Sequence, residues 1–326
     1  MGKIAYSKEL CEELARRAAD PELLVRPRRS RYEGGEVLDV GITGVHQAVQ
    51  GRAGLRLEKF LGGGFAGQVY RCVVERLDLP EGADIPGLRV GGRYAVKIMI
   101  PPGRFSRRFR DLIYWLGFQG PFSAEVNGAA CRAGLLWQKV MRRAARIRFG
   151  TEAAVKDAYA SFWEPGLGAF GEITEWVEGR LWRLEADPEL WRRRRWRTLE
   201  PDGTRSAEYV AKRRFMRDLV ALMHDLGAHE FARQYEWSTM KSQPNAIKRT
   251  DAGDEGPAAG LCAIDFRAGL ALLPFLPMSP ADLRLIVTGL VRRGALVQFD
   301  RGDLARLDGF VAKHAADFTD LQPLLE

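Results

Sequence analysis

The stretch LGGGFAGQVY, residues 61–70, places glycines among residues that otherwise favour a strand. Gly62, Gly64 and Gly67 fit the pattern G-x-G-x-x-G, and Val69 follows two residues later. Because glycine has no Cβ, such a loop lets backbone N–H groups approach phosphate oxygens. Two interpretations fit: a dinucleotide-binding turn between a strand and a helix, or a loop between two strands that covers nucleotide phosphates. The residues that follow, QVYRCVVERL, are rich in β-branched side chains, which favours the second.

The second interpretation is a kinase-type loop, which requires a lysine in a V-A-I-K context on a following strand. The sequence YAVKIM places Lys97 in that context. A lysine amine is a compact charge that suits contact with the α- and β-phosphates. The alternative is an ordinary strand lysine, and the glycine loop upstream favours the functional interpretation.

Together with SAEVNGAA, GEITEWVEGR, STMKSQPNAI and CAIDFRAG, these motifs resemble the protein-kinase-like superfamily over about residues 55–275. SAEVNGAA and IDFRAGL are similar to UbiB-like atypical kinases, and the short C-terminal part is similar to RIO-like and small-molecule kinases. The resemblance implies an α+β, two-lobed protein-kinase-like fold, with an antiparallel-sheet N-lobe, one main helix in that lobe, and a mostly helical C-lobe. The expected parts are a helical, basic extension over residues 1–54, an N-lobe over 55–176 and a C-lobe over 177–326.

The resemblance also assigns an ATP site. The glycines, Val69 and Lys97 would contact the nucleotide, and Glu125 in SAEVNGAA would pair with the lysine. Glu175 to Val177, in a strand that joins the two lobes, would offer backbone groups to the adenine.

A metal site is the second implication of the resemblance. Asn245 in STMKSQPNAI and Asp265 in CAIDFRAG would hold Mg²⁺, a hard cation that prefers oxygen ligands. Arg267 stands where the family usually has the final glycine of the Asp-Phe-Gly motif.

The expected catalytic aspartate is missing from its position. The family has it five residues before the metal-binding asparagine, where this chain has Met240, flanked by Thr239 and Lys241. A thioether does not accept a proton, so one interpretation is a pseudokinase that binds nucleotide as a scaffold or regulator. The other is phosphoryl transfer that depends chiefly on positioning and electrostatics, with Lys241 contacting the γ-phosphate.

A displaced base is a further alternative. Its candidates lie upstream, at His224, His229, Glu230 and Glu236. For the histidines the competing interpretation is packing in the core, and for the glutamates it is an exposed surface position.

These residues require strands and helices to position them. Runs of Val, Tyr and Ile predict strands near residues 55–77 and 91–100, and LCAIDF predicts a short buried strand. Apolar residues at helical spacing predict helices over residues 123–147 and 206–227, and a helical end of the chain.

Composition limits the class of protein. The 326 residues are 46% hydrophobic and 28% charged, which is typical of a globular chain, and the net charge of +8 favours anionic partners such as nucleotides. Four widely separated cysteines predict neither a disulfide framework nor a zinc site and favour a reducing compartment. Without an apolar run long enough for a signal or a membrane helix, we expect a cytoplasmic protein with no transmembrane segment.

Two arginine-rich segments carry aromatic residues, at residues 101–118 and 190–205. Arginine with aromatic side chains suits nucleic acid, and the same residues suit anionic lipid headgroups. The competing interpretation is a solvated helix face with arginine stems packed over tryptophan. The expected substrate is a protein or a small molecule.

Overall fold

The structure is a computed structural model that describes most of the chain. The described residues are 29–64, 67–108, 128–181, 207–236, 245–252, 256–266 and 302–325.

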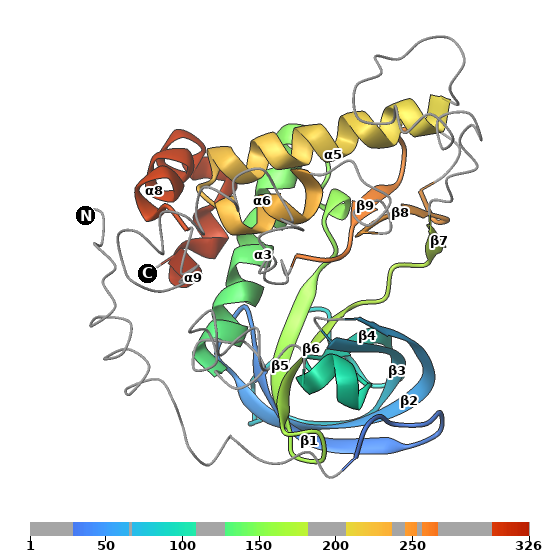
Figure 1. Ribbon diagram of the computed structural model, residues 1–326. Coiled ribbons are helices and arrows are strands. Elements are labelled where there is room, and N and C mark those ends of the chain that lie inside the picture. Colours follow the sequence, from blue (N-terminus) through green and yellow to red (C-terminus); the bar gives the residue numbers. More distant parts are fainter. Residues whose placement is uncertain are drawn as a thin grey trace, which may run out of the picture.

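Six antiparallel strands form a closed barrel, in the order β1-β2-β3-β4-β6-β5 (Figure 1). The strands are β1 (Val37–Gly44), β2 (Gln50–Gly64), β3 (Gly67–Asp78), β4 (Arg93–Ile98), β5 (Ala158–Glu164) and β6 (Ala169–Glu175). Strand positions alternate between the barrel core and the outer face, as period-two alternation requires. In β1, Leu38, Val40 and Ile42 are buried in that core between more exposed neighbours.

The expected two-lobed kinase-like fold, with an open antiparallel sheet beside a mostly helical lobe, is wrong. The barrel sheet has no unpaired edge strand, because β1 pairs with β2 on one side and with β5 on the other. The closing contacts are Ile42 opposite Phe162 and Gly44 opposite Ala160. The physical reason for the error is that β1 lies before residue 55, in a segment that the motifs did not cover. The boundaries expected at residues 54 and 176 stay predictions.

The rest of the described chain combines helices with a second, small sheet. The sheet has the order β7-β8-β9, from β7 (Gly179–Leu181), β8 (Ala246–Arg249) and β9 (Leu261–Ala263). The helices are α3 (Gly128–Phe149), α5 (Ala207–Asp225), α6 (His229–Glu236), α8 (Leu304–Lys313) and α9 (Gln322–Leu325), with short 3-10 turns η3 (Glu152–Ala154), η6 (Ala315–Asp317) and η7 (Thr319–Leu321).

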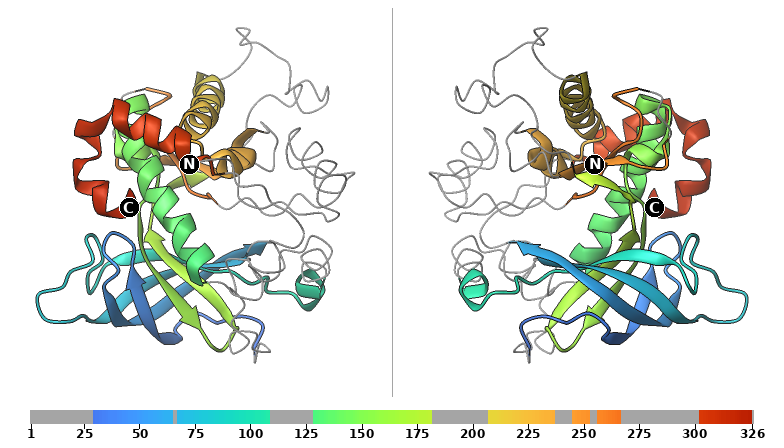
Figure 2. Two further views of the ribbon diagram at one scale, coloured as in Figure 1. Left: turned by 90° about the vertical axis from the view of Figure 1, so that its left-hand side faces the viewer. Right: turned by 90° about the vertical axis from the view of Figure 1, so that its right-hand side faces the viewer.

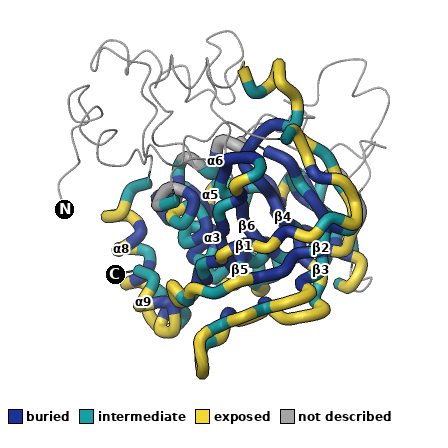
Figure 3. The backbone as a smooth tube through the Cα atoms, turned by 90° about the horizontal axis from the view of Figure 1, so that it is seen from below, coloured by how far each residue is buried: buried dark blue, intermediate teal, exposed yellow. Residues whose placement is uncertain are grey.

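Helix α3 connects the barrel to this helical part, as the two side views show (Figure 2). Its buried face, which includes Met141 and Ala144, packs in one apolar cluster with Leu219 and Met223 of α5 and Phe318 near the end of the chain. Buried residues gather in the barrel strands and along α3 (Figure 3). Within the described residues, no helix combines the length and the apolar character needed to cross a membrane.

Candidate functional site

A row of paired residues crosses four strands on the outer face of the barrel. Gly62 pairs with Val69, Val69 with Lys97, and Lys97 with Glu172 of β6. Directly paired residues project from the same face of a sheet, with Cβ atoms about 4.5–5.5 Å apart. The neighbours of the row along the strands, such as Ile173, lie in the barrel core, so the row faces outward. Three predicted nucleotide contacts are therefore adjacent in the structure.

Lys97 forms an ion pair with Asp265, across 168 residues of sequence. Lys97 Nζ lies 3.0 Å from Asp265 Oδ1. The lysine side chain is 10% exposed, whereas the aspartate side chain is 30% exposed, so the carboxylate faces solvent on one side. The buried Lys97 amine could contact an incoming anion, and the partly exposed Asp265 carboxylate could bind a metal ion that accompanies the anion.

Tyr235 fixes the backbone that carries Asp265. Its hydroxyl donates to the carbonyl of Asp265 at 2.8 Å and lies 3.1 Å from the carbonyl of Asn245. Tyr235 is buried, and burial raises the pKa of its hydroxyl well above the usual range, so it remains a neutral donor. Asn245 precedes β8, and its carbonyl accepts a hydrogen bond from the N–H of Ile264, the residue before Asp265, at 2.8 Å.

The backbones of Asn245 and Asp265, the predicted metal ligands, thus both contact the Tyr235 hydroxyl. Their oxygen donors suit Mg²⁺, which usually takes one or two protein ligands and completes its shell with water and phosphate. No cluster of three or more His, Cys, Asp or Glu residues suited to a metal occurs in the described part of the chain.

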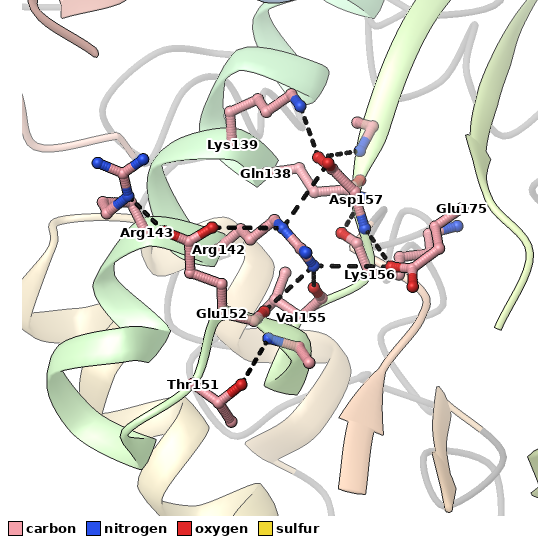
Figure 4. A network of polar contacts seen from close by, with 12 residues as sticks. Gln138, Lys139, Arg142, Arg143, Thr151, Glu152, Val155, Lys156, Asp157 and Glu175 are labelled. Atoms are coloured by element: carbon pink, nitrogen blue, oxygen red, sulfur yellow. Dashed lines mark hydrogen bonds and ion pairs between the residues drawn. The ribbon is translucent and has the colours of Figure 1, made fainter. Parts of the chain in front are cut away.

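The segment between the barrel and the small sheet carries the expected adenine contacts. The carboxylate of Glu175, at the end of β6, lies 2.7 Å from Arg249 Nη1. It also accepts a hydrogen bond from the N–H of Asp157 at 2.9 Å (Figure 4). The N–H of Glu175 donates to the carbonyl of Asp157 at 2.9 Å. An adenine contact here would therefore use the Glu175 carbonyl or the backbone of Val177, a buried residue.

A polar network joins this segment to α3 (Figure 4). The Arg142 guanidinium donates to the carbonyls of Glu152 and Val155 and lies 3.6 Å from Glu175 Oε2. Lys139 Nζ lies 2.6 Å from Asp157 Oδ1. Helix α3, the start of β5 and the end of β6 are consequently tied together beside the site.

Several predicted residues are not placed here. Glu125, Met240 and Lys241 lie outside the described residues, and so do the side chains of Glu230 and Glu236. The two histidines lie at the turn between α5 and α6, where His224 Nδ1 is 2.8 Å from His229 Nδ1. Most of the two arginine-rich segments also lies outside the described part of the chain.

Sequence reasoning missed two buried charges at the site. Glu172 is 3% exposed, and Lys156, just before β5, is 8% exposed. A signal for Glu172 was present, because a lone glutamate interrupts the apolar run AFGEIT in a strand. Lys156 had no comparable signal, since VKDAY is compatible with a surface turn.

Comparisons with known proteins add little to this geometry. No family model matches the chain, and no curated protein matches it. Among solved structures, the chain is similar to the structure of vaccinia related kinase 3, with 10% sequence identity and a TM-score of 0.33. The match covers 72% of this chain and 51% of that chain, so this chain spans about half of that protein's length.

Proposed function

We propose that this protein binds ATP with Mg²⁺ beside the Lys97–Asp265 pair and transfers a phosphoryl group to a protein or small-molecule substrate. The observation that carries the proposal is the 3.0 Å pair itself, between a buried lysine and a partly exposed carboxylate. Its position beside Gly62 and Val69, on the row that crosses the barrel, supports a phosphate-binding role.

The charges of the site suit this ligand. The Lys97 amine would contact phosphate oxygens, while Asp265 and Asn245 would hold the metal. Bound Mg²⁺ would neutralise charge on the phosphate oxygens. Lys97 and Asp265 would then each exchange their mutual contact for one with the ligand, so that no buried charge is left unpaired.

A second candidate is nucleotide binding without turnover. The observation that favours it is Met240, in place of the carboxylate that would accept the substrate proton. Both candidates require the same nucleotide contacts, so binding does not separate them and turnover does.

The competing explanation is a purely structural ion pair between the barrel and the small sheet. Thermal unfolding with and without Mg·ATP tests this for the wild type, Lys97→Met and Asp265→Asn. A ligand at a hundred times its dissociation constant stabilises the folded state by about 2.7 kcal/mol. We expect that stabilisation in the wild type, a loss of it in Lys97→Met, and a loss of its magnesium dependence in Asp265→Asn.

Asp218→Asn is the matched control, because Asp218 forms another 3.0 Å ion pair, with Arg148, on a different surface. It should keep the full response to Mg·ATP. If the wild type does not respond, the pair is structural and the proposed function is wrong. If it responds, release of ADP with candidate substrates distinguishes a phosphotransferase from a protein that only binds nucleotide.

A further inference from the structure

Glu172 lies at the centre of the site although no motif pointed to it. It pairs directly with Lys97 between β6 and β4, and it is almost completely buried. Thr174, two residues further along the same face, donates from its hydroxyl to the carbonyl of Ala95 on β4 at 3.2 Å. A buried carboxylate at this position requires nearby positive charge, because an uncompensated ion is costly to remove from water.

Lys156 supplies a second cation from the other side. Its Nζ lies 3.3 Å from the Thr174 hydroxyl, and Gln138 donates to its carbonyl at 2.9 Å. Its N–H donates to the carbonyl of Ala263 at 3.0 Å, two residues before Asp265. The backbone of Lys156 is therefore bonded to β9, the strand that precedes Asp265, while its amine points toward Thr174 on β6.

The electrostatic surroundings of Lys156 connect these groups. Burial lowers the pKa of its amine, and the nearby carboxylate of Glu172 acts in the opposite direction. Lys97 lowers that pKa further, and Asp265 raises it. Two cations and two carboxylates thus share one buried region, and their formal charges sum to zero.

We propose that Lys97, Lys156, Glu172 and Asp265 form a buried charge quartet, in which Glu172 positions the Lys97 amine and Lys156 is the counter-ion of Glu172. The part of this inference that concerns nucleotide rests on the proposed function. In the quartet, Lys97 has one carboxylate on each side. When Asp265 turns to the metal, the Glu172 carboxylate would still hold the Lys97 amine in place. Lys156 would balance the charge of Glu172, so that Glu172 does not draw the Lys97 amine away from the phosphate.

A double-mutant cycle without nucleotide tests the quartet. The variants are Glu172→Gln, Lys156→Met and the two combined, and the readouts are the melting temperature and the midpoint of urea unfolding. Each single variant leaves one buried charge without its counter-charge, so each should be clearly destabilised. The combined variant restores neutrality, and we expect it to recover most of the loss. If the two losses simply add in the combined variant, the pairing of Lys156 with Glu172 is wrong.

The pH profile adds a readout that loss of packing would not produce. The pKa of Lys156 is lower in the folded state than in the unfolded state. Between these two pKa values the unfolded chain binds more protons than the folded chain, so stability rises with pH. The rise ends at the unfolded pKa of about 10.4. The buried Lys212 also has a lowered pKa, so this test uses a Lys212→Met background. In that background, removing the Glu172 carboxylate should move the start of the rise to lower pH. An unchanged start in Glu172→Gln would overturn the assignment of Glu172 as the partner of Lys156.

Nucleotide affinity tests the positioning role. Loss of a buried, charge-assisted contact should weaken Mg·ATP binding by about tenfold in Glu172→Gln. The combined variant should stay equally weak, because Lys97 still lacks its carboxylate, and Glu172→Asp should restore part of the affinity. Glu75→Gln is the matched control, because Glu75 is an exposed strand carboxylate 2.5 Å from Arg56. Wild-type affinity in Glu172→Gln would overturn the positioning role. Coupling in the cycle without any Mg·ATP binding by the wild type would instead support the quartet and reject the proposed function.

Discussion

Three lysines are buried among the described residues, and their surroundings differ. Lys97 Nζ lies 3.0 Å from Asp265 Oδ1, and Lys156 Nζ lies 3.3 Å from the Thr174 hydroxyl. The third, Lys212 in α5, is 1% exposed. Burial lowers its pKa to about 7, while the carboxylate of Glu208 acts in the opposite direction. Lys212 is therefore expected to change its charge near neutral pH, far below the ordinary range for lysine.

This leads to a pH-dependent stability. An unfolded lysine has a pKa of about 10.4, so between about pH 7 and pH 10 the unfolded chain binds more protons than the folded one at Lys212. The contribution of Lys212 to the unfolding free energy therefore rises with pH across this window. Below about pH 7 Lys212 is charged in the folded state as well, so the full cost of burying its charge is present. Lys212→Met should flatten the rise and raise the melting temperature at pH 6. Urea unfolding from pH 6 to pH 10 measures both effects.

Lys313→Met is the control for that experiment, because Lys313 is exposed in α8. It should show the same pH dependence as the wild type. Parallel curves for the wild type and Lys212→Met would contradict the prediction.

Local sequence context decides which of the site residues could be predicted. Lys97 and Asp265 lie in short motifs with local context, and the structure brings them together. Glu172 lies in an apolar run that could have indicated its burial, but its pairing with Lys97 is a property of the folded chain. For Lys156 the local sequence does not distinguish a buried charge from an exposed one.

At the scale of elements, the glycine-rich ends of β2 and β3 illustrate two different reasons for glycine. Gly62 and Gly67 both have positive φ, +149° and +154°. A Cβ on Gly67 would lie 2.5 Å from the carbonyl oxygen of Ile98, whereas a Cβ on Gly62 would have nothing within 4 Å. Gly67 is therefore required by the packing of β3 on β4, and Gly62 is required only by its backbone conformation.

Alanine substitutions should separate these reasons. Both carry the backbone cost of about 1–3 kcal/mol for a non-glycine residue at an unfavourable φ. Gly67→Ala adds a clash with backbone atoms and should be less stable than Gly62→Ala by roughly 1–3 kcal/mol. Urea unfolding of the two variants measures the difference, and equal stabilities would show that the Ile98 carbonyl moves away at little cost.

Periodicity predicted the main helices but not the way the strands combine. The helix expected over residues 206–227 is α5, Ala207–Asp225, and the described part of the earlier one is α3. In both, a continuous apolar stripe packs into a shared core, so local pattern and tertiary structure agree. The alternation in VLDVGITG was equally readable, but it indicates a strand without indicating its partners.

At the scale of the whole molecule, Arg143 joins the last part of the described chain to α3. Its guanidinium contacts both carboxylate oxygens of Asp320 and lies 2.6 Å from the carbonyl of Asp317 and 2.5 Å from Glu152 Oε1. The aspartate side chain is 58% exposed, whereas the arginine side chain is 16% exposed. Removing the Arg143 guanidinium should therefore lower the unfolding free energy more than removing the charge of Asp320, its most exposed partner.

Arg143→Met keeps the aliphatic stem and removes these contacts. We expect it to lower the unfolding free energy by roughly 1–3 kcal/mol, because several partly buried acceptors lose their donor. Asp320→Asn should cost less than about 1 kcal/mol, since exposed ion pairs contribute little. Hydrogen exchange of residues 315–325 should rise in Arg143→Met. The contribution assigned to Arg143 would be contradicted if the two variants were equally stable.

The closed barrel is the feature that sequence reasoning did not reach. Closure depends on β1 pairing with β5, and these strands are separated by more than a hundred residues. No local motif records a contact at that distance. The motifs therefore indicated candidate residues but did not indicate how the strands around them pair.

Closure of the barrel also has a consequence for the order in which the chain is synthesised. Strands β1 to β4 are complete at Ile98, but β5, which covers the outer edge of β1, begins only at Ala158. At about 5–20 residues per second on the ribosome, the intervening 60 or so residues take roughly 3–12 seconds. Throughout that interval the nascent sheet has two unpaired edges, which are templates for pairing with other chains. Translation arrested before Ala158 would thus release an aggregation-prone fragment, and a chaperone that holds nascent strands would act on this protein in that interval.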